Sequence, residues 1–117
     1  MLRARITRSA SPSVLTPRMI AFEVFVRGDT TVLLLPTWTI IHSRFWKMQV
    51  HYLARHFRVV TYDGPGNGRS VRTSDPGRYT PDAHAADAAA VLDACDVDRA
   101  VVVGLSLGGY YGVRLAA

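Results

Sequence analysis

The pattern of apolar and polar residues along the chain predicts four β-strands. In residues 20–26 apolar side chains recur at every second position, which indicates a strand with one buried face. Phe25 interrupts this alternation, because it adds an apolar side chain to the more polar side. Short apolar runs without alternation are typical of strands buried on both faces, as in a parallel sheet. Thr31–Leu35 and Ala100–Val103 are such runs, and Phe57–Tyr62 is a further predicted strand with Val59 and Val60 at its centre.

Helices are expected after three of these strands. The first covers about residues 43–55, and its apolar positions recur at helical spacing. Its expected buried face consists of Phe45, Met48 and Tyr52, widened by Trp46, Val50 and Leu53. Thr80 is a favourable N-cap before the second helix, Pro81–Ala94, which begins with proline. The third begins at Leu107 and meets no stop signal before Ala117.

Strands that alternate with helices predict an α/β fold with a mostly parallel sheet. Residues 63–79 are rich in Gly, Pro, Ser and Arg, and we expect a long loop there. The ordered pattern occupies residues 20–117, which we interpret as one domain that ends inside a helix. Residues 1–19 precede the domain and are expected to be a basic leader.

Charge changes this picture only at the N-terminus. The chain has 14 basic and 9 acidic residues, a formal net charge of +5. Four arginines precede the first acidic residue, Glu23: Arg3, Arg5, Arg8 and Arg18. We therefore favour a disordered or artefactual leader over a nucleic-acid-binding face. An artefactual leader would mean that the true start is Met19, and a transit peptide is the alternative explanation.

The cysteine content and the hydropathy of the chain limit the environments in which the protein is expected to work. Cys95 is the single cysteine, so an internal disulfide is excluded and no Cys-based metal-binding spacing is present. This fits a reducing compartment. No apolar run approaches the roughly 18 residues of a membrane-spanning helix. We expect a soluble, cytoplasmic chain without a membrane span or a bound metal.

The segment Gly104-Leu105-Ser106-Leu107-Gly108 carries the strongest chemical signal. It matches G-x-S-x-G and lies between the last predicted strand and the last predicted helix, the context in which this motif presents a nucleophile. We expect the sharp turn to hold Ser106 at a positive φ, while the glycines let strand and helix approach closely. The helix N-terminus then brings free N–H groups and the positive end of its dipole to the hydroxyl.

With this motif, residues 20–117 resemble the N-terminal part of an α/β-hydrolase of the serine-nucleophile type. Two more segments support the resemblance. One is similar to the D-x-x-G-x-G-x-S loop of the family: Asp63-Gly64-Pro65-Gly66-Asn67-Gly68-Arg69-Ser70. The other takes the place of the family's apolar strand that runs into His-Gly-x: Leu33-Leu34-Leu35-Pro36-Thr37-Trp38. Pro36 and Thr37 depart from the family pattern at the His-Gly positions.

The resemblance implies a role for three residues. Ser106 would be the nucleophile, and the backbone N–H groups of Leu107 and Trp38 would form the oxyanion hole. The implied activity is hydrolysis of an ester or similar small acyl substrate through an acyl-enzyme, without a cofactor. Serine at this position argues against relatives with an aspartate nucleophile, such as epoxide hydrolases and haloalkane dehalogenases. It does not separate esterases from C–C bond hydrolases, acyltransferases or cofactor-free haloperoxidases.

The rest of the catalytic triad is missing from the sequence. In this family the acid and then the histidine follow the serine, and residues 107–117 contain neither. The histidines all precede Ser106, and we expect surface, loop or partly packed roles for them: His42, His51, His56 and His84. We therefore expect a truncated hydrolase domain that is inactive by itself. A non-catalytic binding or regulatory module and an inactive gene fragment are the alternatives.

The glycine-rich loop also invites comparison with a dinucleotide-binding fingerprint, G-x-G-x-x-G at the start of a helix. Its third glycine, Gly68, comes one residue early, and residues 69–79 separate the loop from the helix cap at Thr80. We therefore expect a tight family-type turn, and no cofactor.

Overall fold

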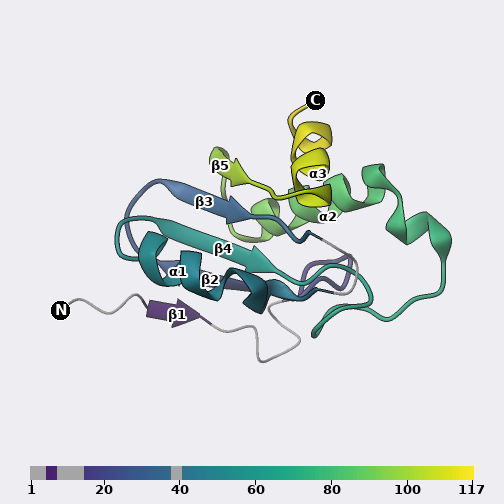
Figure 1. The fold of residues 1–117 in the computed structure, drawn as a ribbon, viewed down its shortest axis with the longest axis horizontal. Coiled ribbons are helices and arrows are strands. Elements are labelled where there is room, and N and C mark those ends of the chain that lie inside the picture. Colours follow the sequence, from purple (N-terminus) through teal and green to yellow (C-terminus); the bar gives the residue numbers. More distant parts are fainter. Residues whose placement is uncertain (1–4, 8–14, 38–40) are drawn as a thin grey trace.

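The protein folds around a five-stranded sheet with helices on both faces (Figure 1). The computed structural model describes residues 5–7, 15–37 and 41–117. The strands are β1 (Arg5–Thr7), β2 (Phe22–Val26), β3 (Thr31–Leu34), β4 (Arg58–Tyr62) and β5 (Ala100–Val103), in the spatial order β1-β2-β4-β3-β5. β3, β4 and β5 are mutually parallel, whereas β1 and β2 run antiparallel to their neighbours. The predicted α/β class with a mostly parallel sheet is confirmed.

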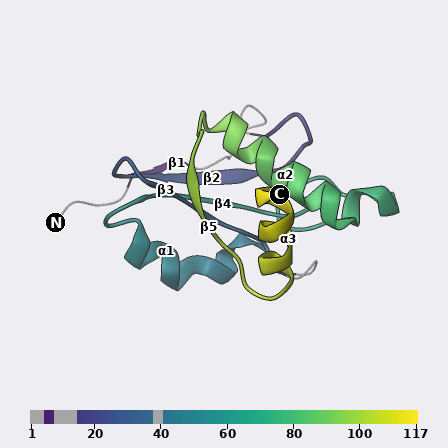
Figure 2. The ribbon, with the colours of Figure 1, turned by 90° about the horizontal axis from the view of Figure 1, so that it is seen from above.

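Three α-helices and two short 3₁₀ helices complete the described part of the chain. The 3₁₀ helix η2 (Ser43–Trp46) leads into α1 (Lys47–Leu53), and η3 (Pro76–Tyr79) precedes α2 (Pro81–Ala94). The last element is α3 (Leu107–Ala116). From above, α1 lies on one side of the sheet and α2 on the other (Figure 2). None of the helices in the described ranges has the length and apolar character that a membrane crossing requires.

The sheet separates two apolar cores. Successive side chains of a strand point to opposite faces, so Leu33 packs with α2 and α3 while Val32 packs with α1. The central strands β3 and β4 are thus buried on both faces, as the continuous apolar run of β3 predicts. The same arrangement explains Phe25, since its ring lies on the second face of β2, against the α1 core.

The predicted buried face of the first helix is only partly correct. The expected stripe is exposed, with Phe45 at 42%, Met48 at 69% and Tyr52 at 63%. Trp46 and Val50, which were expected to widen this face, are buried as predicted. The segment begins as a 3₁₀ helix with three residues per turn, which shifts the phase of the following α-helix relative to an ideal one. The indole N–H of Trp46 also donates to the Leu35 carbonyl oxygen at 2.8 Å, which fixes the face turned to the sheet.

The second helix has the predicted bounds and the predicted cap. The Thr80 hydroxyl accepts a hydrogen bond from the Ala83 N–H at 3.1 Å, and Pro81 opens the helix. The loop before it contains η3, which the sequence pattern did not predict. The Asp75 carboxylate caps this turn by accepting a hydrogen bond from the Gly77 N–H at 2.9 Å.

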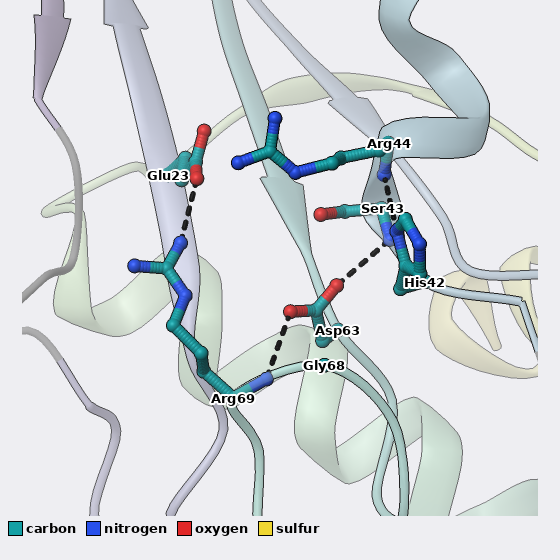
Figure 3. Close-up of a pocket in the computed structure, with 7 residues that line it drawn as sticks. All are labelled: Glu23, His42, Ser43, Arg44, Asp63, Gly68 and Arg69. Atoms are coloured by element: carbon teal, nitrogen blue, oxygen red, sulfur yellow. Dashed lines mark hydrogen bonds and ion pairs between the residues drawn. The ribbon is translucent and has the colours of Figure 1, made fainter.

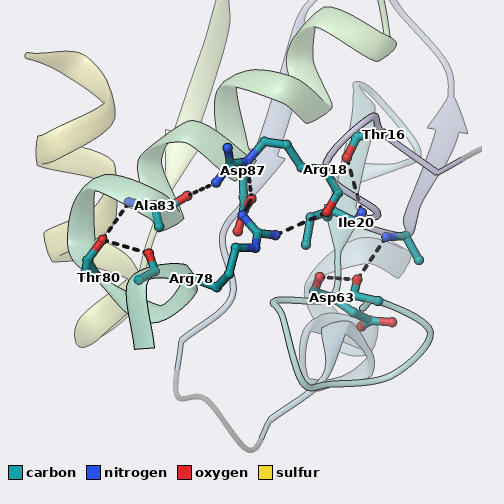
Figure 4. A network of polar contacts seen from close by, with 11 residues as sticks. Thr16, Arg18, Ile20, Asp63, Arg78, Thr80, Ala83 and Asp87 are labelled. Carbon is teal, nitrogen blue, oxygen red and sulfur yellow. Dashed lines mark hydrogen bonds and ion pairs between the residues drawn. The ribbon is translucent and has the colours of Figure 1, made fainter. Parts of the chain in front are cut away.

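Part of the segment expected to be a leader has a defined position in the structure. Thr16 is buried, and the Arg18 guanidinium lies 2.6 Å from the buried carboxylate of Asp87 on α2 (Figure 4). Arg78 contacts the same oxygen of Asp87 at 3.1 Å and donates to the Arg18 carbonyl oxygen. Two guanidinium groups thus compensate one buried carboxylate, and they fasten residues 15–19 to α2. The domain boundary at residue 19 stays a prediction.

The inner face of α2 also buries a histidine. The His84 ring stacks on Tyr111 of α3, with ring centroids 4.2 Å apart. Burial lowers the pKa of His84; the Asp87 carboxylate opposes this shift and the Arg78 guanidinium adds to it. The same Asp87 carboxylate acts on a second buried ring: burial is the main cause of the raised pKa of Tyr62, and the negative charge of Asp87 adds to it. His84 therefore helps to pack α2 against α3.

β5 is the outer strand on one side of the sheet, and its edge is apolar. Val101 is 53% exposed and Val102 is 38% exposed. An exposed edge strand presents unpaired N–H and C=O groups to other chains. We therefore expect the 117-residue chain, produced by itself, to associate in solution.

Replacing Val101 with lysine should reduce this association, because a charge on an edge strand disfavours further pairing. Light scattering at several protein concentrations measures the effect. Val26→Lys is the matched control, since Val26 is similarly exposed at 49% but lies on β2, which has neighbours on both sides. An equal reduction by both substitutions would show that net charge, rather than the β5 edge, controls association.

Candidate active site

The carboxyl ends of the three parallel strands bring the candidate residues together. Thr37 follows β3, Asp63 follows β4, and the turn around Ser106 joins β5 to α3. In open α/β sheets, ligands bind outside the carboxyl ends of the strands. The topology therefore gathers the three sequence motifs on one edge of the sheet.

The turn between β5 and α3 has the strained geometry expected of it. Ser106 is the N-cap of α3 and has φ 57° and ψ −121°, so the predicted positive φ is confirmed. A Cβ atom on Gly104 would lie 2.4 Å from the carbonyl oxygen of Gly108. A Cβ atom on Gly108 would lie 2.6 Å from the carbonyl oxygen of Pro36. Any side chain at either glycine would therefore push α3 away from the sheet.

Ser106 borders a cavity of about 420 Å³. The lining residues come from the loop after β3, from η2 and from the turn: Thr37, Ile41, Phe45, Leu105, Ser106 and Leu107. Leu107 is the first residue of α3, and the first N–H groups of a helix have no partner within the helix. The N–H of Leu107 and the positive end of the helix dipole thus lie beside the serine. Trp38, the second expected oxyanion donor, lies outside the described residues.

Thr37 contributes a contact that the motif comparison did not predict. Its side chain is buried, and its hydroxyl donates a hydrogen bond of 2.8 Å to the carbonyl oxygen of Leu105. This bond joins the loop after β3 to the residue before Ser106. From sequence, Thr37 was a departure from the family glycine that restricts the loop. The structure gives the substituted side chain a specific partner at the turn.

The loop after β4 is closed on itself by the residues of its motif (Figure 3). The buried Asp63 carboxylate accepts hydrogen bonds from the Ser43 N–H at 2.7 Å and the Arg69 N–H at 3.2 Å. The Ser70 hydroxyl donates to the Asp63 carbonyl oxygen and accepts from the Ala21 N–H at 2.9 Å. Asp63 and Ser70 therefore connect the end of β4 with η2 and with the residue before β2, and the motif has a structural role here.

A second cavity, of about 310 Å³, opens above this loop. Arg69 pairs with Glu23 across it at 2.6 Å, and Arg44 extends along its side (Figure 3). His42 caps η2, since its Nδ1 accepts a hydrogen bond from the Arg44 N–H at 3.2 Å. Within the described ranges, no group of three or more His, Cys, Asp or Glu side chains is arranged to hold a metal.

No base accompanies the serine in the described part of the chain, where no hydrogen bond joins Ser106 Oγ to another residue. His42 caps η2 and His84 stacks on Tyr111. His51 and His56 are exposed on and after α1. A serine hydroxyl without a neighbouring base is a weak nucleophile.

Comparison with known proteins agrees with this geometry. The family model of the alpha/beta hydrolase fold matches residues 30–117. Proteins named carbamate hydrolase RutD are similar, at 45% identity over 74 residues in Caulobacter segnis and 38% over 91 residues in Azorhizobium caulinodans. These matches cover 63% and 78% of this chain. The chain belongs to the alpha/beta hydrolase fold family.

Solved structures of hydrolases resemble the fold. An epoxide hydrolase from an endophytic Streptomyces superposes with a TM-score of 0.80 at 28% identity over 99% of this chain. An N-acyl homoserine lactone degrading enzyme superposes with a TM-score of 0.75 at 32% identity over 82% of it. The chain spans 28% and 34% of the two carbamate hydrolases and 34% and 36% of these two structures.

Proposed function

We propose that the protein is a serine hydrolase that cleaves an ester or similar acyl bond, with Ser106 as the nucleophile. The observation that carries the proposal is the positive φ of Ser106 at the N-terminus of α3, beside a cavity. Strain of this kind costs about 1–3 kcal/mol and persists only where the surrounding structure enforces it. Gly104 and Gly108 supply that enforcement through their close backbone contacts.

The proposed reaction has two acyl-transfer steps. Ser106 Oγ bonds to the substrate carbonyl carbon while its proton passes to a histidine base. The Leu107 N–H stabilises the negative oxygen of the tetrahedral intermediate, and one such donor is typically worth about 10²–10³ in rate. The bond to the leaving group then breaks, and the histidine returns the proton to that group. Water repeats the sequence on the acyl-enzyme, which releases the acid and restores Ser106.

The histidine and its partner acid belong to sequence beyond Ala117 in this proposal. Serine at position 106 favours acyl transfer over the epoxide opening of relatives with an aspartate nucleophile, although an epoxide hydrolase shares the fold. The two alternatives, a non-catalytic module and an inactive gene fragment, rest on the absence of a base near Ser106 in the described residues. Gene sequence downstream of Ala117 that encodes no acid and no histidine would favour the alternatives.

Activity should therefore depend on sequence beyond Ala117. The 117-residue chain should show no turnover of p-nitrophenyl acetate above background, whereas the full-length protein should hydrolyse it. Steady-state absorbance of p-nitrophenol measures both. Turnover by the short chain that Ser106→Ala abolishes would show that a base is recruited from within these 117 residues. A full-length protein whose Ser106 neither turns over esters nor reacts with a fluorophosphonate would contradict the proposal.

Thr37 should position the turn for this reaction. Thr37→Val keeps the shape of the side chain but leaves the Leu105 carbonyl oxygen without its donor, so the turn loses its tie to the loop after β3. We expect kcat of the full-length protein to fall about tenfold, because small displacements of reacting groups are costly, with little change in KM. Thr37→Ser keeps the hydroxyl and should restore most of kcat. If the serine variant is as slow as the valine variant, the hydrogen bond is not the cause.

A further inference from the structure

The cavity beside Ser106 is lined mainly by apolar side chains. Apart from Ser106 itself, its lining has one side chain with a polar group, Thr37. That hydroxyl already donates its proton to the Leu105 carbonyl oxygen. The remaining lining side chains are aliphatic or aromatic: Ile41, Phe45, Leu105 and Leu107. The described lining residues therefore offer a bound molecule apolar surface and little else.

Large apolar side chains face solvent where they line this cavity. Phe45 is 42% exposed and Leu105 is 52% exposed. Phe45 is also held in place, since its ring packs edge-on against Trp46 with ring centroids 5.2 Å apart. The Trp46 indole is fixed in turn by its hydrogen bond to Leu35. Phe45 is thus an exposed but anchored wall of the cavity.

We propose that this cavity binds the apolar acyl group of the substrate, and that Phe45 and Leu105 set the preference for acyl length. The inference rests on the proposed function, because it takes Ser106 as the attacking group. A straight acyl chain of several carbons would cover the exposed surfaces of Phe45 and Leu105. Each buried methylene contributes about 0.8 kcal/mol, or roughly fourfold in binding.

The same lining disfavours a small polar substrate. The amide nitrogen of a carbamate would lie among apolar side chains and lose its hydrogen bonds to water. Leaving a buried polar group unpaired is unfavourable. Of the activities named for the similar proteins, degradation of an N-acyl compound fits the cavity better than hydrolysis of a carbamate.

The test compares p-nitrophenyl acetate, butanoate and hexanoate in the full-length protein. The kcat/KM should rise roughly 15-fold from butanoate to hexanoate, which differ by two methylenes. Phe45→Ala should remove most of this rise, and Leu105→Ala should act in the same direction. Met48→Ala is the matched control: Met48 is a more exposed apolar residue of α1 that does not line the cavity, so it should leave the profile unchanged.

Two further measurements separate this inference from the proposed function. A small ethoxy fluorophosphonate reports Ser106 reactivity without an acyl chain: the Oγ–P bond forms, the P–F bond breaks, and fluoride and the hydroxyl proton leave. Labelling of Ser106 with a flat acyl-length profile, or with a profile that Phe45→Ala does not alter, would overturn the inference alone. No labelling and no turnover would overturn the proposed function. Calorimetry on Ser106→Ala should still show tighter binding of p-nitrophenyl hexanoate than of p-nitrophenyl acetate. Equal binding of the two esters would again reject the apolar site.

Discussion

Replacing Ser106 with glycine is expected to abolish ester turnover in the full-length protein and to raise its melting temperature. The loss of activity follows from the loss of the nucleophile, and removal of such a group costs about 10⁴-fold or more in kcat. The gain in stability follows from the backbone, because Ser106 has φ 57° and glycine adopts this conformation without a Cβ penalty.

The sign of the stability change depends on two opposing effects. Relief of strain contributes about 1–3 kcal/mol. The added flexibility of glycine in the unfolded chain costs about 0.4–1 kcal/mol. The strain is the larger effect, so we expect net stabilisation and an increase in Tm of about 2 °C or more.

Ser106→Ala is the control that separates the two effects. Alanine removes the hydroxyl but keeps a Cβ atom at the strained position, so it should be inactive without the increase in Tm. Thermal melting and ester turnover are recorded for both variants beside the parent. A glycine variant that melts below the parent and keeps its activity would refute both the strained turn and the role of Ser106.

The sequence was most informative where one local pattern decides the structure. The positive φ of Ser106 could be predicted because the G-x-S-x-G motif joins a strand to a helix by a short turn, which leaves its backbone little conformational choice. Thr80 and Pro81 defined the start of α2 for a similar reason, since an N-cap side chain bonds to a backbone N–H only three residues away. The tight turn at the D-x-x-G-x-G-x-S loop could also be predicted from its motif. The partners of the Asp63 carboxylate, on η2 and within the loop, could not.

Features that depend on distant partners could not be predicted in this way. The helical spacing of Phe45, Met48 and Tyr52 indicated a buried stripe, but the preceding 3₁₀ turn and the contact of Trp46 with β3 turned it to solvent. Arg18 was counted as part of a basic leader, because its partner Asp87 is 69 residues away. Thr37 was visible only as a departure from a family pattern, since its hydrogen bond crosses from β3 to the turn after β5.

The exposed apolar stripe on η2 and α1 has an explanation outside the core. A sequence pattern cannot distinguish apolar residues that pack in a core from apolar residues that line a binding cavity. Phe45 belongs to the second kind, because it lines the cavity beside Ser106, whereas Met48 on the same stripe does not. The apolar spacing of this helix thus reflects two separate requirements, one structural and one connected with the proposed substrate.

Replacing Gly108 with valine should have the opposite effect on stability from Ser106→Gly. A Cβ atom at this position would lie 2.6 Å from the carbonyl oxygen of Pro36, which is backbone and has little freedom to move. Relieving the overlap requires α3 to shift away from the loop after β3, and overpacking of this kind costs about 1–3 kcal/mol. The shift would also displace Ser106 and the Leu107 N–H from the substrate, and a displacement of about 1 Å can cost about 10²-fold in rate.

Gly109→Ala provides the matched control for this substitution. Gly109 is the next residue of α3, but its Cβ atom would lie 3.6 Å from the nearest atom outside the helix, the Gly104 carbonyl oxygen, an ordinary van der Waals distance. Alanine is also favoured over glycine within a helix by about 0.8–1 kcal/mol. We therefore expect Gly109→Ala to melt at or above the Tm of the parent and to keep its activity, while Gly108→Val melts several degrees lower and loses most of its turnover. Equal melting of Gly108→Val and the parent would show that the turn does not depend on close contact between α3 and the loop after β3.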